Sequence, residues 1–164
     1  MHAASLYSAE MNESHASCVF CRIVAGTEES SMVYEDERVI AFLDILPINP
    51  GHTLIIPRRH GAYLKDMDPE DGAAMFRAGI KIGAAVRASG LKCEGINLLL
   101  NDGAEPVGSS PEEFEAGQRV FHSHLHVIPR IVGDSFRRDL NAPPIQRAIL
   151  DDAAAKIRAA LTSA

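Results

Sequence analysis

Short apolar runs separated by turn residues dominate the chain between residues 18 and 60. Runs at 32–34 and 39–43 flank the charged turn EDER, and the apolar run TLIIP follows the loop LPINPGH. Runs of this length, bounded by Pro, Gly or charged residues, are typical of β-strands. The pattern predicts three consecutive strands, with a short turn and helix in CVFCRIVAG that ends at Gly26.

A helical period replaces these runs in MDPEDGAAMFRAGIKIGAAVRASG. Asp68 suits the N-cap, Pro69 suits the first turn, and Gly90 suits the stop. Apolar side chains recur three or four residues apart, which predicts one face packed on a sheet. This stripe consists of Met75, Ala78, Ile82 and Val86.

The second half of the chain predicts two more strands and a closing helix. GINLLLN is expected to be a buried strand and RVFHSHLHVIPR another, with a polar loop rich in Gly, Ser and Pro between them. The end, PPIQRAILDDAAAKIRAALTSA, predicts a helix whose apolar residues are four apart. They are Ile145, Ile149, Ala153 and Ile157. Because strands mostly follow one another directly, we expect an α+β domain around an antiparallel sheet.

Composition narrows the class of protein. The 164 residues favour one domain with a real core, and 46% hydrophobic and 23% charged residues are ordinary for a soluble globular protein. The net charge of -6 argues against nucleic acid or a membrane surface as partners. No run approaches the length of a transmembrane helix. Residues 1–16 lack the features of a secretion signal and predict a flexible tail.

The cysteine content indicates the redox compartment. The chain has three cysteines, Cys18, Cys21 and Cys93, and an odd count without an export signal favours a reducing, cytoplasmic location. The C-x-x-C spacing of Cys18 and Cys21 therefore indicates metal or redox chemistry before a disulfide. Cys93 is interpreted as an ordinary lone thiol.

Three histidines alternate in FHSHLHVIPR. On a strand, side chains two apart share a face, so His122, His124 and His126 are expected to line one side in steps of about 7 Å. An exposed polar face, or a structural metal site using one or two of them, are the alternatives. Neutral imidazole is both a nucleophile and a hydrogen-bonding group, which suits phosphorus chemistry. The preceding Gly117 and Gln118 add backbone and side-chain amides that can hold phosphate oxygens.

The segment AGQRVFHSHLHVIPR resembles the signature of the histidine triad (HIT) family. The similarity continues in CVFCRIVAG, VYEDERVIAFLDILPINPGHTLIIPRRH and NLLLND, and covers roughly residues 18 to 132. The resemblance implies an α+β, HIT-like fold with a five-stranded antiparallel sheet, a long helix packed on it and a C-terminal helix. It also implies one domain over 17–164, usually assembled as a homodimer.

The resemblance assigns catalytic roles residue by residue. His124 would be the nucleophile that forms a nucleotidyl-histidine intermediate, His126 would contact the phosphate oxygens, and His122 would orient the nucleophile. Gln118 would lie near the leaving group. Asn101 would contact the phosphate, although before Gly103 it is also a good turn residue.

The resemblance also assigns a nucleotide pocket. Asp44 would accept hydrogen bonds from the ribose hydroxyls, although it also suits a turn before Pro47. An apolar wall would enclose the base, usually a purine, and Gly117 would border the nucleotide. The wall consists of Phe20, Ile23, Phe42, Leu43 and Ile45. An ordinary core role for these apolar side chains is the alternative on composition alone.

A zinc site follows from the same resemblance. In bacterial-type members, two cysteines, the histidine of a motif like IPRRH and the first histidine of the row hold zinc. This corresponds to Cys18, Cys21, His60 and His122 here. A closed Cys₂His₂ site is structural, and it would fix the ring of His122. A reduced thiol pair without metal is the alternative. His52, in PGHT, is assigned no chemistry.

Two features depart from the family pattern. An insertion of roughly ten residues within 104–116 carries four glutamates beside the expected phosphate site, where it would repel polyphosphates or act as a lid. Arg119 follows Gln118 where a small hydroxyl residue is common. Arg119 either replaces that contact or points to solvent.

The sequence therefore predicts a nucleotide hydrolase or transferase that acts at the nucleoside-linked phosphorus. The substrate would be a purine nucleoside phosphoramidate, an acyl-adenylate or a dinucleoside polyphosphate. The alternative is a nucleotide-binding or interaction protein with little or no catalysis. A redox protein using the cysteine pair is disfavoured because the pair follows a tail rather than a strand. A P-loop kinase is excluded because no Gly-x-x-x-x-Gly-Lys motif exists.

Overall fold

The computed structural model describes residues 16–103, 117–135 and 143–163. The predicted N-terminal tail, apart from Ala16, and the predicted insertion within 104–116 therefore lie outside the described residues.

Five antiparallel strands form one sheet in the order β1-β2-β3-β5-β4. Their bounds are β1 Met32–Glu35, β2 Val39–Leu43, β3 Thr53–Pro57, β4 Gly95–Leu100 and β5 Leu125–Arg130. Every residue of β2 and β3 is buried, as expected for fully apolar runs in the middle of a sheet. The predicted α+β class and the five-stranded antiparallel sheet are confirmed.

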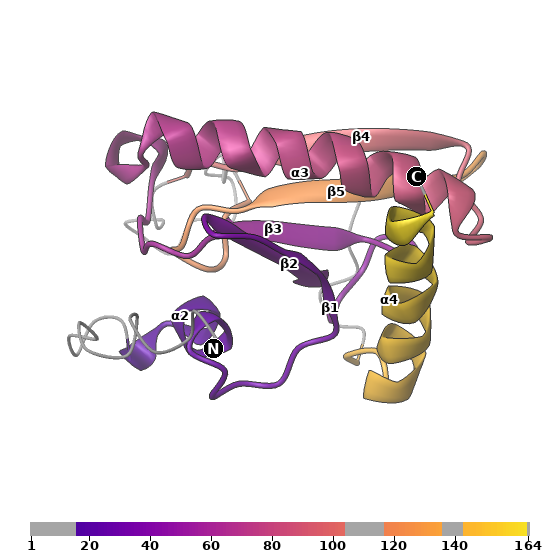
Figure 1. The fold of residues 1–164 in the computed structure, drawn as a ribbon, viewed down its shortest axis with the longest axis horizontal. Coiled ribbons are helices and arrows are strands. Elements are labelled where there is room, and N and C mark those ends of the chain that lie inside the picture. Colours follow the sequence, from indigo (N-terminus) through magenta and orange to yellow (C-terminus); the bar gives the residue numbers. More distant parts are fainter. Residues whose placement is uncertain (1–15, 104–116, 136–142, 164) are drawn as a thin grey trace, which may run out of the picture.

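The long helix α3 (Pro69–Ala88) and the C-terminal helix α4 (Arg147–Thr162) cover one side of the sheet (Figure 1). The backbone N–H of Glu70 donates to the Asp68 side chain at the α3 N-cap, as the sequence predicted. The predicted stripe of α3 is buried against the sheet. Strand residues facing these helices include Ala41, Ile55 and Val127. We call this side the α3 face.

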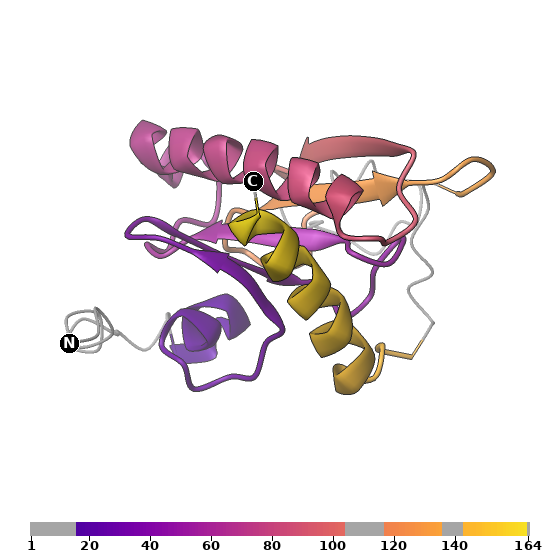
Figure 2. The same cartoon turned by 45° about the vertical axis from the view of Figure 1, so that its right-hand side comes forward.

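The opposite side of the sheet carries the short helix α2 (Val19–Val24), below the strands in Figures 1 and 2. Phe20 of this helix packs against strand residues that alternate with those of the α3 face. They are Ile40, Phe42, Leu54 and Ile56. Gly26, with φ of +73°, follows the helix where the sequence predicted its end. We call this side the α2 face.

Two sequence expectations need correction. β4 was expected to be buried, but it is an edge strand, and its residues are only half-buried or exposed. α4 begins at Arg147, so Ile145 precedes it, and Ile149 is 59% exposed. The buried face of α4 consists of Leu150, Ala153, Ala154 and Ile157. These residues follow the i, i+3, i+4, i+7 spacing of an amphipathic helix. The predicted set was spaced four residues apart throughout, so its first members lie off the buried face.

Within the described part of the chain, no helix combines the length and apolar character that crossing a membrane requires.

Candidate active site

The three histidines of the row do not all lie on the strand that the alternation predicted. β5 begins at Leu125, so only His126 is a strand residue. The backbone ahead of it bends: the N–H of His122 donates to the carbonyl of Val120 at 2.8 Å, and the N–H of Ser123 donates to Gly61 at 2.7 Å. These local bonds replace the sheet ladder. All three imidazoles are nevertheless buried.

The ring of His124 is held in one tautomer. Its Nδ1 lies 2.8 Å from the main-chain carbonyl oxygen of His122. A carbonyl can only accept, so Nδ1 carries the proton and Nε2 keeps its lone pair. The ring also packs edge-on against Phe20 at 5.3 Å and His126 at 4.8 Å between centroids. The carbonyl of His122 therefore orients the ring of His124.

His126 is oriented by His52, to which the sequence assigned no chemistry. The backbone N–H of Ile48 donates to His52 Nδ1 at 3.1 Å, so the proton of neutral His52 is on Nε2. That Nε2 lies 3.0 Å from His126 Nδ1 and donates to it. The proton of neutral His126 is therefore on Nε2, which makes this atom a hydrogen-bond donor. The only sequence feature that marks His52 is its position directly before the buried strand β3, and this position does not indicate a partner.

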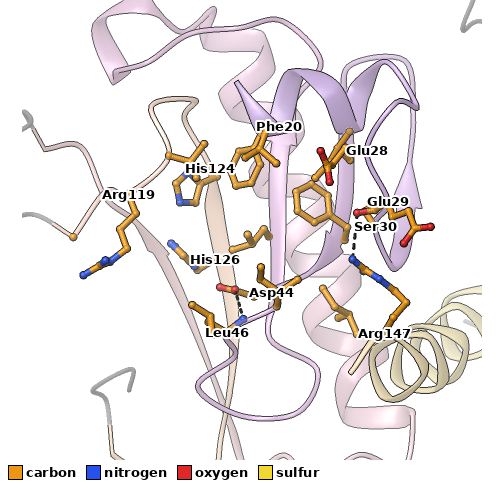
Figure 3. Close-up of a pocket in the computed structure, with 18 residues that line it drawn as sticks. Phe20, Glu28, Glu29, Ser30, Asp44, Leu46, Arg119, His124, His126 and Arg147 are labelled. Carbon is orange, nitrogen blue, oxygen red and sulfur yellow. Dashed lines mark hydrogen bonds between the residues drawn. The ribbon is translucent and has the colours of Figure 1, made fainter. Parts of the chain in front are cut away.

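A pocket of about 270 Å³ opens beside His124 and His126, on the α2 face (Figure 3). It brings together most of the predicted nucleotide residues with side chains from the 28–30 segment and α4. The lining includes Phe20, Ile23, Phe42, Leu43, Asp44, Ile45, Gly117, Arg119, His124, His126 and Arg147. The wall near the aromatic rings is apolar, and the two ends are polar.

Asp44 is a buried carboxylate in the middle of the pocket lining (Figure 3). Its Oδ1 accepts from the backbone N–H of Leu46 at 2.9 Å. Its Oδ2 lies 3.8 Å from His52 Nε2. The carboxylate is therefore fixed in place and still presents acceptor capacity to a ligand.

The other predicted phosphate-site residues lie at the border of this pocket. Gln118 donates from Nε2 to the carbonyl of Ala62 at 2.6 Å and accepts at Oε1 from the N–H of Gly103 at 3.2 Å. Gly117 has φ of +87°, and a side chain there would meet Asn101 at 3.3 Å. Gly117 lines the pocket, whereas Gln118 and Asn101 support its rim from outside.

A second cluster lies between α2, the residues after β3 and the histidine row. Cys18, Cys21, His60 and His122 each offer a ligand atom, and all these atoms lie within 4.8 Å of one another. His122 Nε2 donates to the carbonyl of Pro57 at 2.9 Å, so its Nδ1 lone pair faces Cys21 Sγ at 3.6 Å. The Nδ1 of His60 lies 3.3 Å from the same sulfur.

The electrostatics of this cluster fit a cation. Burial, followed by the neighbouring Cys18, raises the pKa of the Cys21 thiol to about 12. Two thiols and two imidazoles whose ligand atoms lie close together form the kind of donor set that binds a tetrahedral metal ion. The bond from His122 to Pro57 is the kind of contact that orients a metal-binding histidine.

The comparisons with known proteins agree with this geometry. Residues 25–132 match the HIT domain. The chain belongs to the HIT family. The "Protein hit" of Bacillus subtilis is 42% identical over 120 residues, which are 73% of this chain and 75% of that protein.

Two solved HIT-type structures resemble the whole fold. A zinc-bound histidine triad family protein from Mycobacterium smegmatis has a TM-score of 0.74 and 42% identity, covering 91% of this chain and 96% of that one. A HIT-like protein involved in cell-cycle regulation from Bartonella henselae has a TM-score of 0.72 and 34% identity, covering 88% and 96%. The predicted family is confirmed, and HIT proteins are typically nucleotide hydrolases or transferases.

Proposed function

We propose that this HIT protein cleaves nucleotides at the nucleoside-linked phosphorus through a covalent intermediate on His124. The observation that carries the proposal is the tautomer of His124. Its Nδ1 proton is engaged by the carbonyl of His122, and the nucleophilic Nε2 belongs to a ring that lines the pocket.

The pocket supports one direction of nucleotide binding. The phosphorus would lie at His124 and His126, the ribose hydroxyls at Asp44, and the base between Phe20 and the residues after β2. A carboxylate can accept two hydrogen bonds from neighbouring hydroxyls, and flat aromatic walls suit a base. Gln118 and Asn101 would shape the backbone around Gly117, next to the phosphate.

The chemistry proceeds in two displacements. First, Nε2 of His124 attacks the phosphorus, a P–N bond forms, and the bond to the leaving group breaks with its electron pair. The carbonyl of His122 stabilises the resulting imidazolium through Nδ1–H, and His126 donates from Nε2 to a non-bridging oxygen. Water then attacks the phosphorus and releases its proton to solvent, the P–N bond breaks, and the electron pair returns to Nε2.

We further propose that the Cys₂His₂ cluster holds a structural zinc ion. Cys18, Cys21, His60 and His122 would be its four ligands, which leaves no open position for catalysis. The zinc-bound relative from Mycobacterium smegmatis supports this assignment. When bound, the ion would supply positive charge that stabilises the two thiolates. Thiolate ligands require reduced cysteines, which favours the cytoplasm.

A homodimer is proposed from the exposed edge of the fold. β4 is an edge strand, and Phe76 and Ile80 on α3 are 54% and 59% exposed. An unpaired strand edge beside an exposed apolar helix stripe is suited to pairing with a second copy. Ile80→Asp is expected to shift the molecular mass measured by light scattering from dimer to monomer.

Turnover by a His124 variant tests the proposal directly. His124→Asn and His124→Gly are expected to lower kcat by at least roughly a thousandfold and to retain nucleotide binding. The substrates are an adenosine and a guanosine phosphoramidate, an acyl-adenylate and a diadenosine polyphosphate. Rapid acid quench of the wild type with a radiolabelled substrate is expected to trap one nucleotidyl group per active site.

Two results would contradict the covalent mechanism. Unchanged turnover in either His124 variant would show that another group is the nucleophile. Tight nucleotide binding by a wild type that turns over none of the substrates would favour the alternative, a nucleotide-binding protein without catalysis.

A further inference from the structure

The end of the pocket remote from His124 is polar. Glu28, Glu29 and Ser30, from the segment between α2 and β1, line it together with Arg147 from the first turn of α4. In Figure 3, Arg147 reaches from α4 toward Glu29 and Ser30, and Asp44 lies between this end and the two histidines. A nucleotide whose phosphorus is at His124 and whose ribose is at Asp44 therefore directs its base toward Arg147.

The guanidinium of Arg147 is held in a fixed orientation. Its Nη1 donates to Ser31 Oγ at 3.1 Å, and its Nη2 donates to the main-chain carbonyl of Glu29 at 3.3 Å. Ser31 is itself buried and donates to Asp151 Oδ1 at 2.6 Å. These contacts join α4 to the segment before β1. They engage two of the five N–H donors of the guanidinium, and Arg147 lines the pocket.

The carboxylates around Arg147 disfavour a phosphate at this end. Glu28 and Glu29 both line the same part of the pocket, and a phosphate would be repelled by their carboxylates. Glu28 Oε2 is paired with Arg22 at 3.0 Å, which places this carboxylate beside the pocket. The ligand group that fits here is neutral and offers acceptors to Arg147.

Arg147 lies outside residues 25–132, which match the HIT domain. The arginine is therefore contributed by the C-terminal helix, beyond the residues that match the domain.

We infer that Arg147 is a specificity-determining residue that selects purines with an oxygen at C6, guanine and hypoxanthine, over adenine. This inference rests on the proposed function. In such purines O6 and N7 are adjacent acceptors, and they match the parallel N–H donors of a guanidinium. Adenine presents N7 beside an amino group, so one N–H donor of Arg147 would face another donor. A desolvated donor without an acceptor is costly, which discriminates against adenine.

Binding of three nucleoside monophosphates tests this inference. They are GMP, IMP and AMP, which resemble the product of the proposed reaction and need no turnover. In the wild type, isothermal calorimetry is expected to give dissociation constants for GMP and IMP about tenfold lower than for AMP. Arg147→Gln is expected to bring all three within about twofold, because a glutamine amide can satisfy either purine edge.

Two further variants serve as controls. Arg158→Gln, on the same helix, removes an arginine that contacts the carbonyl of Met32 outside the pocket, and it is expected to retain the full preference. Arg147→Lys keeps the positive charge but loses the pair of parallel N–H donors. It is therefore expected to retain only part of the preference for GMP and IMP over AMP. The ratio of two dissociation constants does not depend on the fraction of folded protein, so a partly destabilised variant still gives an answer.

Each outcome decides between the two proposals. Equal affinity for GMP and AMP in the wild type, or a preference that persists in Arg147→Gln, overturns the role of Arg147. Tight binding of GMP with IMP resembling AMP shows that the 2-amino group is recognised instead, and overturns it as well. If these results occur while His124→Asn still abolishes turnover, the proposed function stands and only the base assignment falls. Absence of binding by all three nucleotides overturns the base assignment, and the proposed function falls with it only if the wild type also turns over none of the substrates.

Discussion

The two faces of the sheet differ in what they hold. The α3 face holds most of the apolar core, and the α2 face holds the pocket and the histidine row. The α3 face buries a large apolar cluster under two long helices. Among the described residues, the buried apolar cluster of the α2 face is smaller and consists of Phe20 and four strand residues; beside it lie the histidine row and the pocket. A large continuous core on one side provides most of the burial energy. The other side can then hold an open pocket and buried polar rings, which cost stability.

The short helix of the α2 face depends on more than packing. α2 has six residues, too few to be stable alone, and it contributes Phe20 to both the pocket wall and the edge contact with His124. Cys18 and Cys21 flank Phe20 and face His60 and His122. The Cys₂His₂ cluster therefore connects the pocket wall to the histidine row.

Metal removal is expected to have the largest effect on the stability of the α2 face and on its pocket. Chelation, or Cys21→Ser, should cost several kcal/mol of stability and should increase protease cleavage around α2. Loss of the Phe20 wall should also weaken nucleotide binding by more than about tenfold. Unfolding midpoints, limited proteolysis and calorimetry measure the three effects.

Cys93→Ser is the matched control for metal removal. Cys93 donates to the carbonyl of Gly95 at 3.2 Å and lies outside the cluster, so its loss should leave metal content and nucleotide binding unchanged. Wild-type protein purified without chelator is expected to contain one zinc ion per chain. Two freely reactive thiols at Cys18 and Cys21 and no bound zinc would contradict the assignment.

Adjacent residues of β3 compare the two faces directly. Ile55 is fully buried on the α3 face, and Leu54 lines the pocket on the α2 face. Ile55→Ala is expected to cost about 2–5 kcal/mol by leaving a dry cavity, with kcat/KM per folded molecule unchanged. Leu54→Ala should cost about 2 kcal/mol or less because water can enter the pocket, but it should raise KM. Urea unfolding and steady-state kinetics measure both, and a reversed pattern would contradict the division.

The sequence correctly predicted the structural features that depend on local residue patterns. The bounds of β2 and β3 and the cap of α3 at Asp68 followed from apolar runs and from residues with known turn and cap preferences. The zinc ligands were predicted from the family resemblance, and the structure brings all four together.

Tertiary contacts explain what the sequence did not predict. His52 and His126 are 74 residues apart, so their hydrogen bond has no local signal. The alternation of the row predicted a strand through His122, but bonds from the row to Val120 and Gly61 displaced the ladder there. Arg147 enters the pocket because α4 packs beside β1, which no periodicity in α4 reveals.

The Arg130–Asp134 ion pair at the end of β5 is expected to make stability depend on acid pH. The guanidinium of Arg130, with N–H donors from Ile131 and Asn49, holds the pKa of Asp134 well below its usual range. Asn49 belongs to the loop that leads to His52, so this pair supports the α2 face.

The sign of this pH effect follows from the lowered pKa. The contribution of Asp134 is fully present above its unfolded pKa of about 4 and is lost as pH falls toward the lower folded value. Asp134→Asn should therefore reduce stability at neutral pH, and its difference from wild type should shrink below about pH 4. Unfolding midpoints at a series of pH values measure this difference. A constant difference down to about pH 2 would show that hydrogen bonding, not charge, is responsible.

Substitution of Arg119 is expected to have the smallest effect. It tests whether a solvent-exposed charge at the edge of the α2 face affects substrate binding. The side chain is exposed and lines the mouth of the pocket at the end near His124 and His126. An exposed charge at this position should attract anionic substrates weakly, by at most about 1 kcal/mol at low salt. Arg119→Ser should therefore raise KM up to about fivefold at low ionic strength, with kcat unchanged. The difference should vanish near 0.5 M salt, roughly, because screening is then strong. A loss of kcat that persists at high salt would instead place the guanidinium on the reacting phosphate.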